Sequence, residues 1–204
     1  SDWSSDVCSS DLHLRDESRA HSRVLCEVHA TSDLDEAAIQ LLQEPSETGD
    51  AGRDATGSFR DPDLLGHRYV GPYLAWGRGT QLVAVDAEGV AGYLLSADDT
   101  ATFEAWAEET WWPPLRARHP RTEDDTPDGA LIRELHAPER SDTALLADFP
   151  AHLHIDLLPR VRGTGTGRRL VERLLAELAA RGGRGVHLGV DATNPNRSEE
   201  HTSE

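Results

Sequence analysis

The sequence predicts an α/β fold, and three consecutive patterns between residues 151 and 193 predict it. Residues 151–158 alternate between apolar and polar side chains, which is typical of a half-buried strand. A leucine-rich stretch follows a glycine-rich turn, repeats its apolar residues at helical spacing and ends at Gly182 and Gly183. A short apolar run at residues 186–190 predicts a second strand. The unit is therefore strand, glycine-rich turn, helix, strand.

The glycine-rich turn, residues 162–167, reads Arg-Gly-Thr-Gly-Thr-Gly. Glycines at alternate positions leave backbone N–H groups uncovered. These groups lie where a helix begins, with its unpaired amides and the positive end of its dipole. Such a turn predicts an anion site, and phosphate is the usual anion. The alternative to an anion site is a glycine-rich connection that binds no ligand.

Three phosphate ligands compete for this turn. A P-loop needs a Lys after its last glycine, whereas Arg168 follows here and the chain contains no Lys. A dinucleotide fingerprint needs the spacing G-x-G-x-x-G, and the turn has G-x-G-x-G. Asp191 nevertheless lies roughly where a ribose-binding acid is expected. The pyrophosphate of coenzyme A is the third ligand, and the residues alone leave all three open.

The composition of the chain limits the classes of binding partner that are expected. The formal net charge is −17 over 204 residues, which argues against nucleic acid and anionic membranes and is compatible with a cationic amine. No apolar run is long enough to cross a membrane, and no signal peptide is visible. Of the two cysteines, Cys8 lies in a terminal segment considered next, which leaves Cys26 alone. No disulfide framework is expected, and we predict a cytoplasmic protein.

The two ends of the chain resemble translated adapter DNA. Residues 197–204 (RSEEHTSE) and residues 5–12 (SDVCSSDL) can be encoded by one DNA strand and its reverse complement, and residues 2–4 continue the same pattern. Two unrelated protein termini rarely encode each other in antisense. We therefore predict that residues 1–12 and 197–204 are non-native and that residues 13–196 form one domain.

The rest of the chain predicts further strands and helices around the central unit. Strands are expected at 24–30, Gln81–Asp86 and 90–96, the last two joined as a hairpin, and helices at 34–42, 64–74 and 100–118. Pro113 and Pro114 must kink the last helix or start a new one. Residues 45–60 are typical of a loop, and residues 121–150 are expected to be a long acidic excursion that covers one side of the site.

The turn and its surroundings resemble a known family. Residues 162–167 match the R/Q-x-x-G-x-G/A signature of GCN5-related N-acetyltransferases, and the flanking strand–helix–strand order fits as well. Residues 61–196 resemble bacterial relatives of the acetyltransferase-like domain of O-GlcNAcase, through segments 71–74, 89–93 and 152–159. The resemblance implies a mixed, mostly antiparallel central sheet flanked by helices. The family's last helix and strands would be missing after Asn196.

The resemblance also implies acetyl-CoA as co-substrate and no metal. The backbone of Ile155, Asp156 and Leu157 would align the pantetheine arm, and Asn194 would meet the cofactor where two strands splay apart. The amides and guanidinium groups of the turn would hold the pyrophosphate, namely those of Arg162, Gly163, Thr164, Gly165, Thr166, Gly167 and Arg168.

A base must accept the proton of the acceptor ammonium. Strand alternation places His152, His154 and Asp156 on one face, and His154 with Asp156 is our candidate pair because histidine titrates near neutral pH. The alternative is that these are polar strand residues that pack under a loop and have no catalytic role.

Five other residues are candidates to contact the acceptor. The resemblance places Asp50, Arg53 and Asp54 beside it, and Trp111 and Trp112 are candidates for a wall of its pocket. The alternative for the three loop residues is that they are simply solvated. The alternative for the two tryptophans is that they belong to an aromatic core.

The predicted function is transfer of an acetyl group from acetyl-CoA to the amine of a small-molecule acceptor, with neither nucleic acid nor membrane as partner and a homodimer left open. A non-catalytic acyl-CoA-binding module and a nucleotide-binding domain of another class are the alternatives. The family usually carries a Tyr on the helix after the second strand, and this sequence reaches residue 197 without that helix. The chain itself is therefore expected to be inactive.

Overall fold

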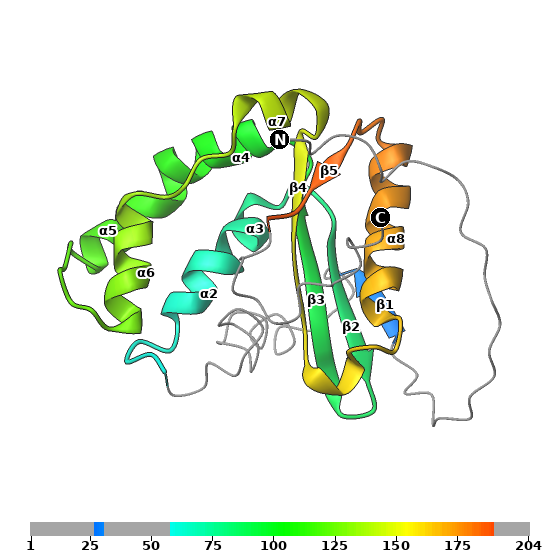
Figure 1. Cartoon of the computed structure of the whole chain (residues 1–204), viewed down its shortest axis with the longest axis horizontal. Helices are drawn as coiled ribbons and strands as arrows, with labels where there is room; N and C mark the ends of the chain where they lie inside the picture. Colours follow the sequence, from blue (N-terminus) through cyan, green and yellow to red (C-terminus); the bar gives the residue numbers. More distant parts are fainter. Residues whose placement is uncertain (1–26, 31–57, 190–204) are drawn as a thin grey trace, which may run out of the picture.

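A computed structural model describes residues 27–30 and 58–189, and these form a five-stranded sheet with helices on both faces (Figure 1). The strands lie in chain order: β1 (Glu27–Ala30), β2 (Gln81–Asp86), β3 (Gly89–Ala97), β4 (Ala151–Leu157) and β5 (Val186–His187). The pairs from β1 to β4 are antiparallel, and β5 runs parallel to β4. This confirms the mixed, mostly antiparallel sheet that the sequence predicts.

One face of the sheet is covered by helix α8 (Thr166–Ala180). Leu170, Leu174 and Leu178 recur at helical spacing and are buried against the sheet. Alternate strand residues meet them, such as Leu82 of β2 and Leu153 of β4. The predicted helix of residues 167–181 is thus confirmed within one residue at each end.

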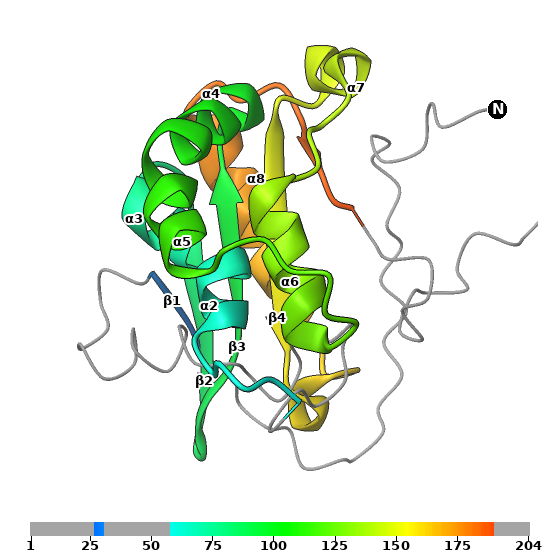
Figure 2. The ribbon, with the colours of Figure 1, turned by 90° about the vertical axis from the view of Figure 1, so that its left-hand side faces the viewer.

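The opposite face carries most of the other helices, as Figure 2 shows from the side. They are α2 (Leu64–Tyr69), α3 (Gly71–Trp76), α4 (Thr100–Trp106), α5 (Trp112–Arg118) and α6 (Pro127–His136), while α7 (Thr143–Asp148) lies at the end of the sheet where β4 begins. Tyr73 and Phe103 pack on the sheet beside Tyr93 and Leu95, while α2, α5 and α6 form a further apolar cluster around Leu64. The sheet is therefore the middle layer of three.

The predicted helix at residues 100–118 is interrupted by a π-helical segment, η2 (Ala107–Trp111). Pro113 and Pro114 follow it at the start of α5. Neither proline has an N–H to continue the α-helical ladder, and the N–H of Trp112 instead bonds to the carbonyl of Ala107, five residues back. The two prolines thus follow a local change of helical hydrogen bonding within a continuous helical run, where the sequence predicts either a kink or a new helix.

Two expectations need correction. The stretch 121–150 is not simply an irregular excursion, because it contains α6 and α7, capped by the side chains of Thr126 and Asp142. The second strand of the central unit is shorter than residues 186–190, since only Val186 and His187 pair with β4. The predicted helix at 34–42, most of the loop at 45–60, Asp191, Asn194 and both terminal segments lie outside the described residues.

Candidate functional site

The glycine-rich turn connects β4 to α8 through a short 3-10 segment, η3 (Pro159–Val161). Gly163 and Gly165 have φ values of 72° and 82°, a left-handed conformation that favours glycine. A Cβ built on either residue would meet no atom within 4 Å, so the space over both is open. The turn therefore leaves its backbone exposed to a ligand. In a connection packed against the protein, neighbouring atoms would fill the space over these glycines.

The start of α8 is not capped by a side chain at Gly165. The first amides of an α-helix have no partner within the helix, and they carry the positive end of its dipole. The hydroxyls of Thr164 and Thr166 are used inside the turn: Thr164 Oγ1 donates to the Val161 carbonyl at 2.6 Å and lies 2.8 Å from Thr166 Oγ1. The turn thus offers an anion its amides more than its hydroxyls.

Two arginines predicted to hold the anion flank these amides. Arg162 Nε donates to the carbonyl of Leu157 at 3.0 Å, which fixes its stem over the end of β4. Arg168 Nε donates to Glu172 at 2.7 Å along the exposed side of α8. Both guanidinium groups add positive charge beside the turn.

The polar face of β4 is the second part of the site. His152, His154 and Asp156 point away from α8, because Ala151 and Leu153 face it. The alternation seen in the sequence therefore gives the correct face for all three residues. In the described part of the chain, the β4–β5 ladder ends at His152, which pairs with His187.

His154 lies under two tyrosines. Its Nε2 is 3.3 Å from the hydroxyl of Tyr93, and its ring stacks on Tyr69 with centroids 5.7 Å apart. Burial, together with the charge of Arg68, lowers the pKa of His154 to about 4. Asp156, its predicted partner, accepts from the backbone N–H of Leu157 at 3.1 Å. Because its pKa is lowered to about 4, His154 is neutral at neutral pH.

His152 sits in a tighter hydrogen-bonded setting. Its Nδ1 lies 2.8 Å from Thr100 Oγ1, and its Nε2 lies 2.7 Å from the hydroxyl of Tyr73. Burial lowers the pKa of His152 to about 4, with smaller contributions from His187 and His154. Sequence reasoning missed this arrangement because Thr100 and Tyr73 are 52 and 79 residues away along the chain.

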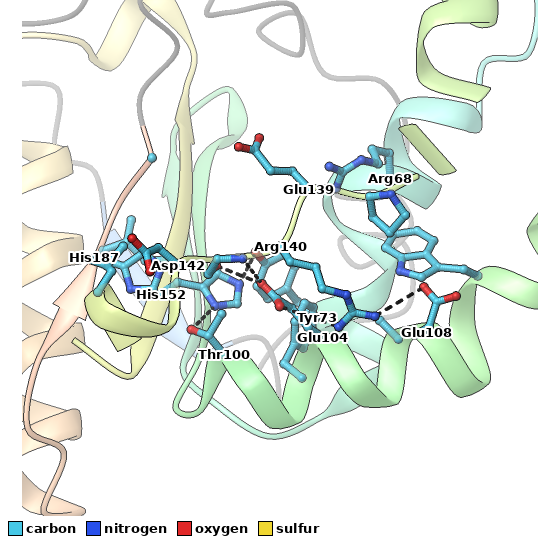
Figure 3. Close-up of a pocket in the computed structure, with 18 residues that line it drawn as sticks. Arg68, Tyr73, Thr100, Glu104, Glu108, Glu139, Arg140, Asp142, His152 and His187 are labelled. Atoms are coloured by element: carbon cyan, nitrogen blue, oxygen red, sulfur yellow. Dashed lines mark hydrogen bonds and ion pairs between the residues drawn. The ribbon is translucent and has the colours of Figure 1, made fainter. Parts of the chain in front are cut away.

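A pocket of about 490 Å³ opens beside His152 (Figure 3). It is lined by residues from α2, α3, α4, η2, α5, α7, β4, β5 and the segment 138–142, so the stretch after α6 forms one wall. Among the described residues, the lining includes His152 and His187 but not His154. Both tryptophans pack in the α2–α5–α6 cluster; Trp112 also contributes to the pocket wall, whereas Trp111 donates to the carbonyl of His67.

The charged groups of the pocket are mostly acidic. Its lining carries the four acids Glu104, Glu108, Glu139 and Asp142 against the two arginines Arg68 and Arg140. Glu104 accepts from the backbone N–H and the hydroxyl of Ser141, and a hydrogen bond from Arg116 lowers the pKa of Glu108. Within the described residues, no group of three His, Cys, Asp or Glu side chains is placed to hold a metal ion.

The comparisons with known proteins place this geometry in a family. No family model matches the chain. The solved structure of SsHAT is 32% identical in sequence, superposes with a TM-score of 0.70, and the match covers 83% of this chain and 84% of SsHAT. An acetyltransferase from Brucella melitensis in complex with acetyl-CoA, described as a member of the GNAT family, is 14% identical over 83% of this chain and 79% of its own, with a TM-score of 0.44. The chain belongs to the GCN5-related N-acetyltransferase (GNAT) family.

GNAT membership confirms the resemblance carried by the turn at residues 162–167. The chain is also similar to protein O-GlcNAcase of Rattus norvegicus, with 25% identity over 133 residues. That match covers 63% of this chain and only 14% of O-GlcNAcase, so it concerns a small part of that protein. Among the helices of the described residues, none has both the length and the hydropathy of a membrane span.

Proposed function

We propose that this GNAT protein transfers an acetyl group from acetyl-CoA to the amine of a small-molecule acceptor. The observation that carries the proposal is the open, left-handed pair Gly163 and Gly165 before the uncapped start of α8. Phosphate needs amides that no side chain covers, and this turn supplies them beside Arg162 and Arg168. The donor set therefore fits the pyrophosphate of coenzyme A.

The outer side of β4 fits the pantetheine arm. β4 pairs along its length with β3, from His152 opposite Ala97 to Leu157 opposite Gly92. On its other side, the described part of β5 pairs only as far as His152. The strand edge at Ile155 is then available to an extended ligand that bonds as a strand would. This supports the assignment of Ile155, Asp156 and Leu157 to the pantetheine.

The acceptor site is the pocket beside His152, and its excess of acids favours a cationic amine. Glu104 and Asp142 lie on the wall formed by α4 and the segment before α7. A carboxylate favours the charged form of an amine and attracts it into a low-dielectric pocket. A group on this polar face accepts the proton of the amine; the sequence predicts His154 with Asp156 for this role, and His152 on the pocket wall is the other candidate.

A non-catalytic acyl-CoA-binding module is the second candidate. It is favoured by the limited match to O-GlcNAcase, where the similar segment makes up a small share of a larger protein. Both candidates need the same turn and differ only in the chemical step.

Two measurements test the proposal. A thermal-shift comparison of acetyl-CoA, NAD and ATP on the 204-residue chain should show stabilisation by acetyl-CoA alone, because only a ligand that binds the native state raises Tm. Thiol release from acetyl-CoA with a panel of small amines should then detect transfer, in contrast to the expectation from the sequence that this chain is inactive. Stabilisation by NAD or ATP in place of acetyl-CoA contradicts the CoA assignment. Binding without thiol release for any amine favours the non-catalytic module.

A further inference from the structure

Tyr73, His152 and Thr100 form a hydrogen-bonded row that brings together α3, β4 and α4 (Figure 3). All three residues line the pocket beside β5. Tyr73 is also fixed by its ring, which stacks on Phe103 with centroids 4.8 Å apart. The row is therefore held rigidly at the wall of the proposed acceptor site.

The direction of the hydrogen bonds in this row follows from which of its atoms carry protons. The hydroxyl of Thr100 has one proton, and it donates that proton to the carbonyl of Pro150 at 2.7 Å. Toward His152 the same oxygen can only accept, so Nδ1 of the neutral imidazole carries the ring proton. Nε2 is then a lone-pair acceptor, and the hydroxyl of Tyr73 donates to it.

The neighbouring tyrosine–histidine pair is built differently. Tyr93 and His154 are 3.3 Å apart, compared with 2.7 Å for Tyr73 and His152. His154 is not among the described residues that line the pocket, and Tyr69 stacks on its ring. Of the two histidines, only His152 combines a fixed tautomer with a place on the pocket wall.

We propose that the acceptor amine loses its proton through Tyr73 to His152, rather than to His154 and Asp156; the idea rests on the proposed acetyl transfer. The bound ammonium first gives one proton to the Tyr73 oxygen while the Tyr73 proton moves to Nε2 of His152. The neutral nitrogen then attacks the thioester carbonyl carbon, so the C–N bond forms and the C–S bond breaks with its electron pair on sulfur. The second proton of the nitrogen goes to the thiolate and His152 releases the first to solvent, giving the amide and the thiol.

The surroundings of His152 suit a group that accepts a proton for a short time. Burial keeps its pKa near 4, so Nε2 carries no proton at neutral pH before the reaction. Tyr73 on α3, Thr100 on α4 and His187 on β5 contact His152, while Glu104 and Asp142 line the same pocket. Nδ1 donates to Thr100, which keeps the ring proton on that nitrogen throughout.

The chain has three tyrosines, and this allows a matched set of single-atom deletions. Tyr73→Phe removes the relay hydroxyl but keeps the stacked ring. We expect its kcat to fall about 10- to 100-fold, within the usual range for losing a positioned acid–base group. The Kd for acetyl-CoA and the Tm should stay close to those of the wild type. Tyr69→Phe and Tyr93→Phe remove hydroxyls on the same side of the sheet, beside His154, and their kcat should stay within about twofold of the wild type.

Chemical rescue separates a proton-transfer role from a structural one. His152→Ala should lose turnover and regain part of it when free imidazole is added, because imidazole can replace the missing ring in the pocket. His154→Ala should show no such rescue. A Tyr73→Phe variant with full kcat, or rescue at His154→Ala but not at His152→Ala, overturns the relay while the acetyltransferase function stands. A wild-type chain that binds acetyl-CoA but acetylates no amine overturns both.

Discussion

Arg160 and Asp86 are 74 residues apart in the chain, yet Arg160 Nε donates to Asp86 Oδ2 at 2.9 Å. The same guanidinium group donates to the carbonyl of Val90 at 2.9 Å. The hydrogen bond from Arg160, with help from the backbone N–H groups of Glu88 and Gly89, lowers the pKa of Asp86. This contact ties the segment before the glycine-rich turn to the β2–β3 hairpin.

Arg160→Ala should therefore loosen the turn without removing any residue assigned to the ligand. We expect a loss of about 1.5–3 kcal/mol in the free energy of unfolding, the usual range for hydrogen bonds to charged groups. Acetyl-CoA affinity should fall only modestly. Urea melts measure the first effect and calorimetry the second. A variant as stable as the wild type would show that the contact does not hold the segment.

A second prediction concerns pH. His152 and His154 have pKa values lowered to about 4 in the folded chain, while an unfolded histidine titrates near 6.5. Between these values the unfolded state binds more protons, so the stabilisation is complete above pH 6.5 and is lost as pH falls toward 4. From pH 7.5 to pH 5.0 each histidine should lower the free energy of unfolding by about 2 kcal/mol.

Urea melts at these two pH values measure the loss. His154→Gln cannot titrate, so it should show a loss smaller by about 2 kcal/mol than that of the wild type. The carboxylates with lowered pKa, such as Glu108 and Glu177, are present in both proteins, so their contribution cancels in this comparison. If His154→Gln loses as much stability as the wild type, His154 is not the buried neutral group described above.

A third prediction concerns the charge beside the turn. Arg162→Ala should weaken acetyl-CoA about tenfold, because a charge-assisted contact to phosphate contributes on the order of 1.5–3 kcal/mol. Arg78→Ala is the matched control: it removes the same charge from the residue that stacks on Trp76, ahead of β2 and at the opposite end of the sheet. Equal affinities of the two variants for acetyl-CoA would argue that Arg162 does not touch the ligand.

The local patterns of the sequence predicted the fold well. The alternation of residues 151–158 gives β4 and its two faces, the leucine spacing gives α8, and the glycines give the turn, because each pattern depends on neighbours along the chain. The helices α6 and α7 also had a local signal that was overlooked, since Thr126 and Asp142 are strong N-cap residues.

The site was predicted only in part. The position of the turn could be predicted from its own residues, and so could the face that bears His152 and His154, while the pyrophosphate ligand of the turn stays a prediction. Which histidine meets Tyr73 and Thr100 depends on how α3 and α4 pack across β4, and no local pattern reports that packing. The pairing of Arg160 with Asp86 escaped sequence reasoning for the same reason.

The most direct test of the central claim is a calorimetric titration of acetyl-CoA into the wild type, Gly165→Val and Gly182→Val. Gly165 and Gly182 lie at opposite ends of α8 with φ values of 82° and 78°, and a Cβ on either meets no atom within 4 Å. Both valines are strained alike, so a general loss of stability should be similar. We predict that Gly182→Val binds acetyl-CoA as the wild type does and that Gly165→Val binds at least about tenfold more weakly, because its side chain covers the helix amides. Equal affinities of the two variants would contradict the assignment of this turn to the pyrophosphate.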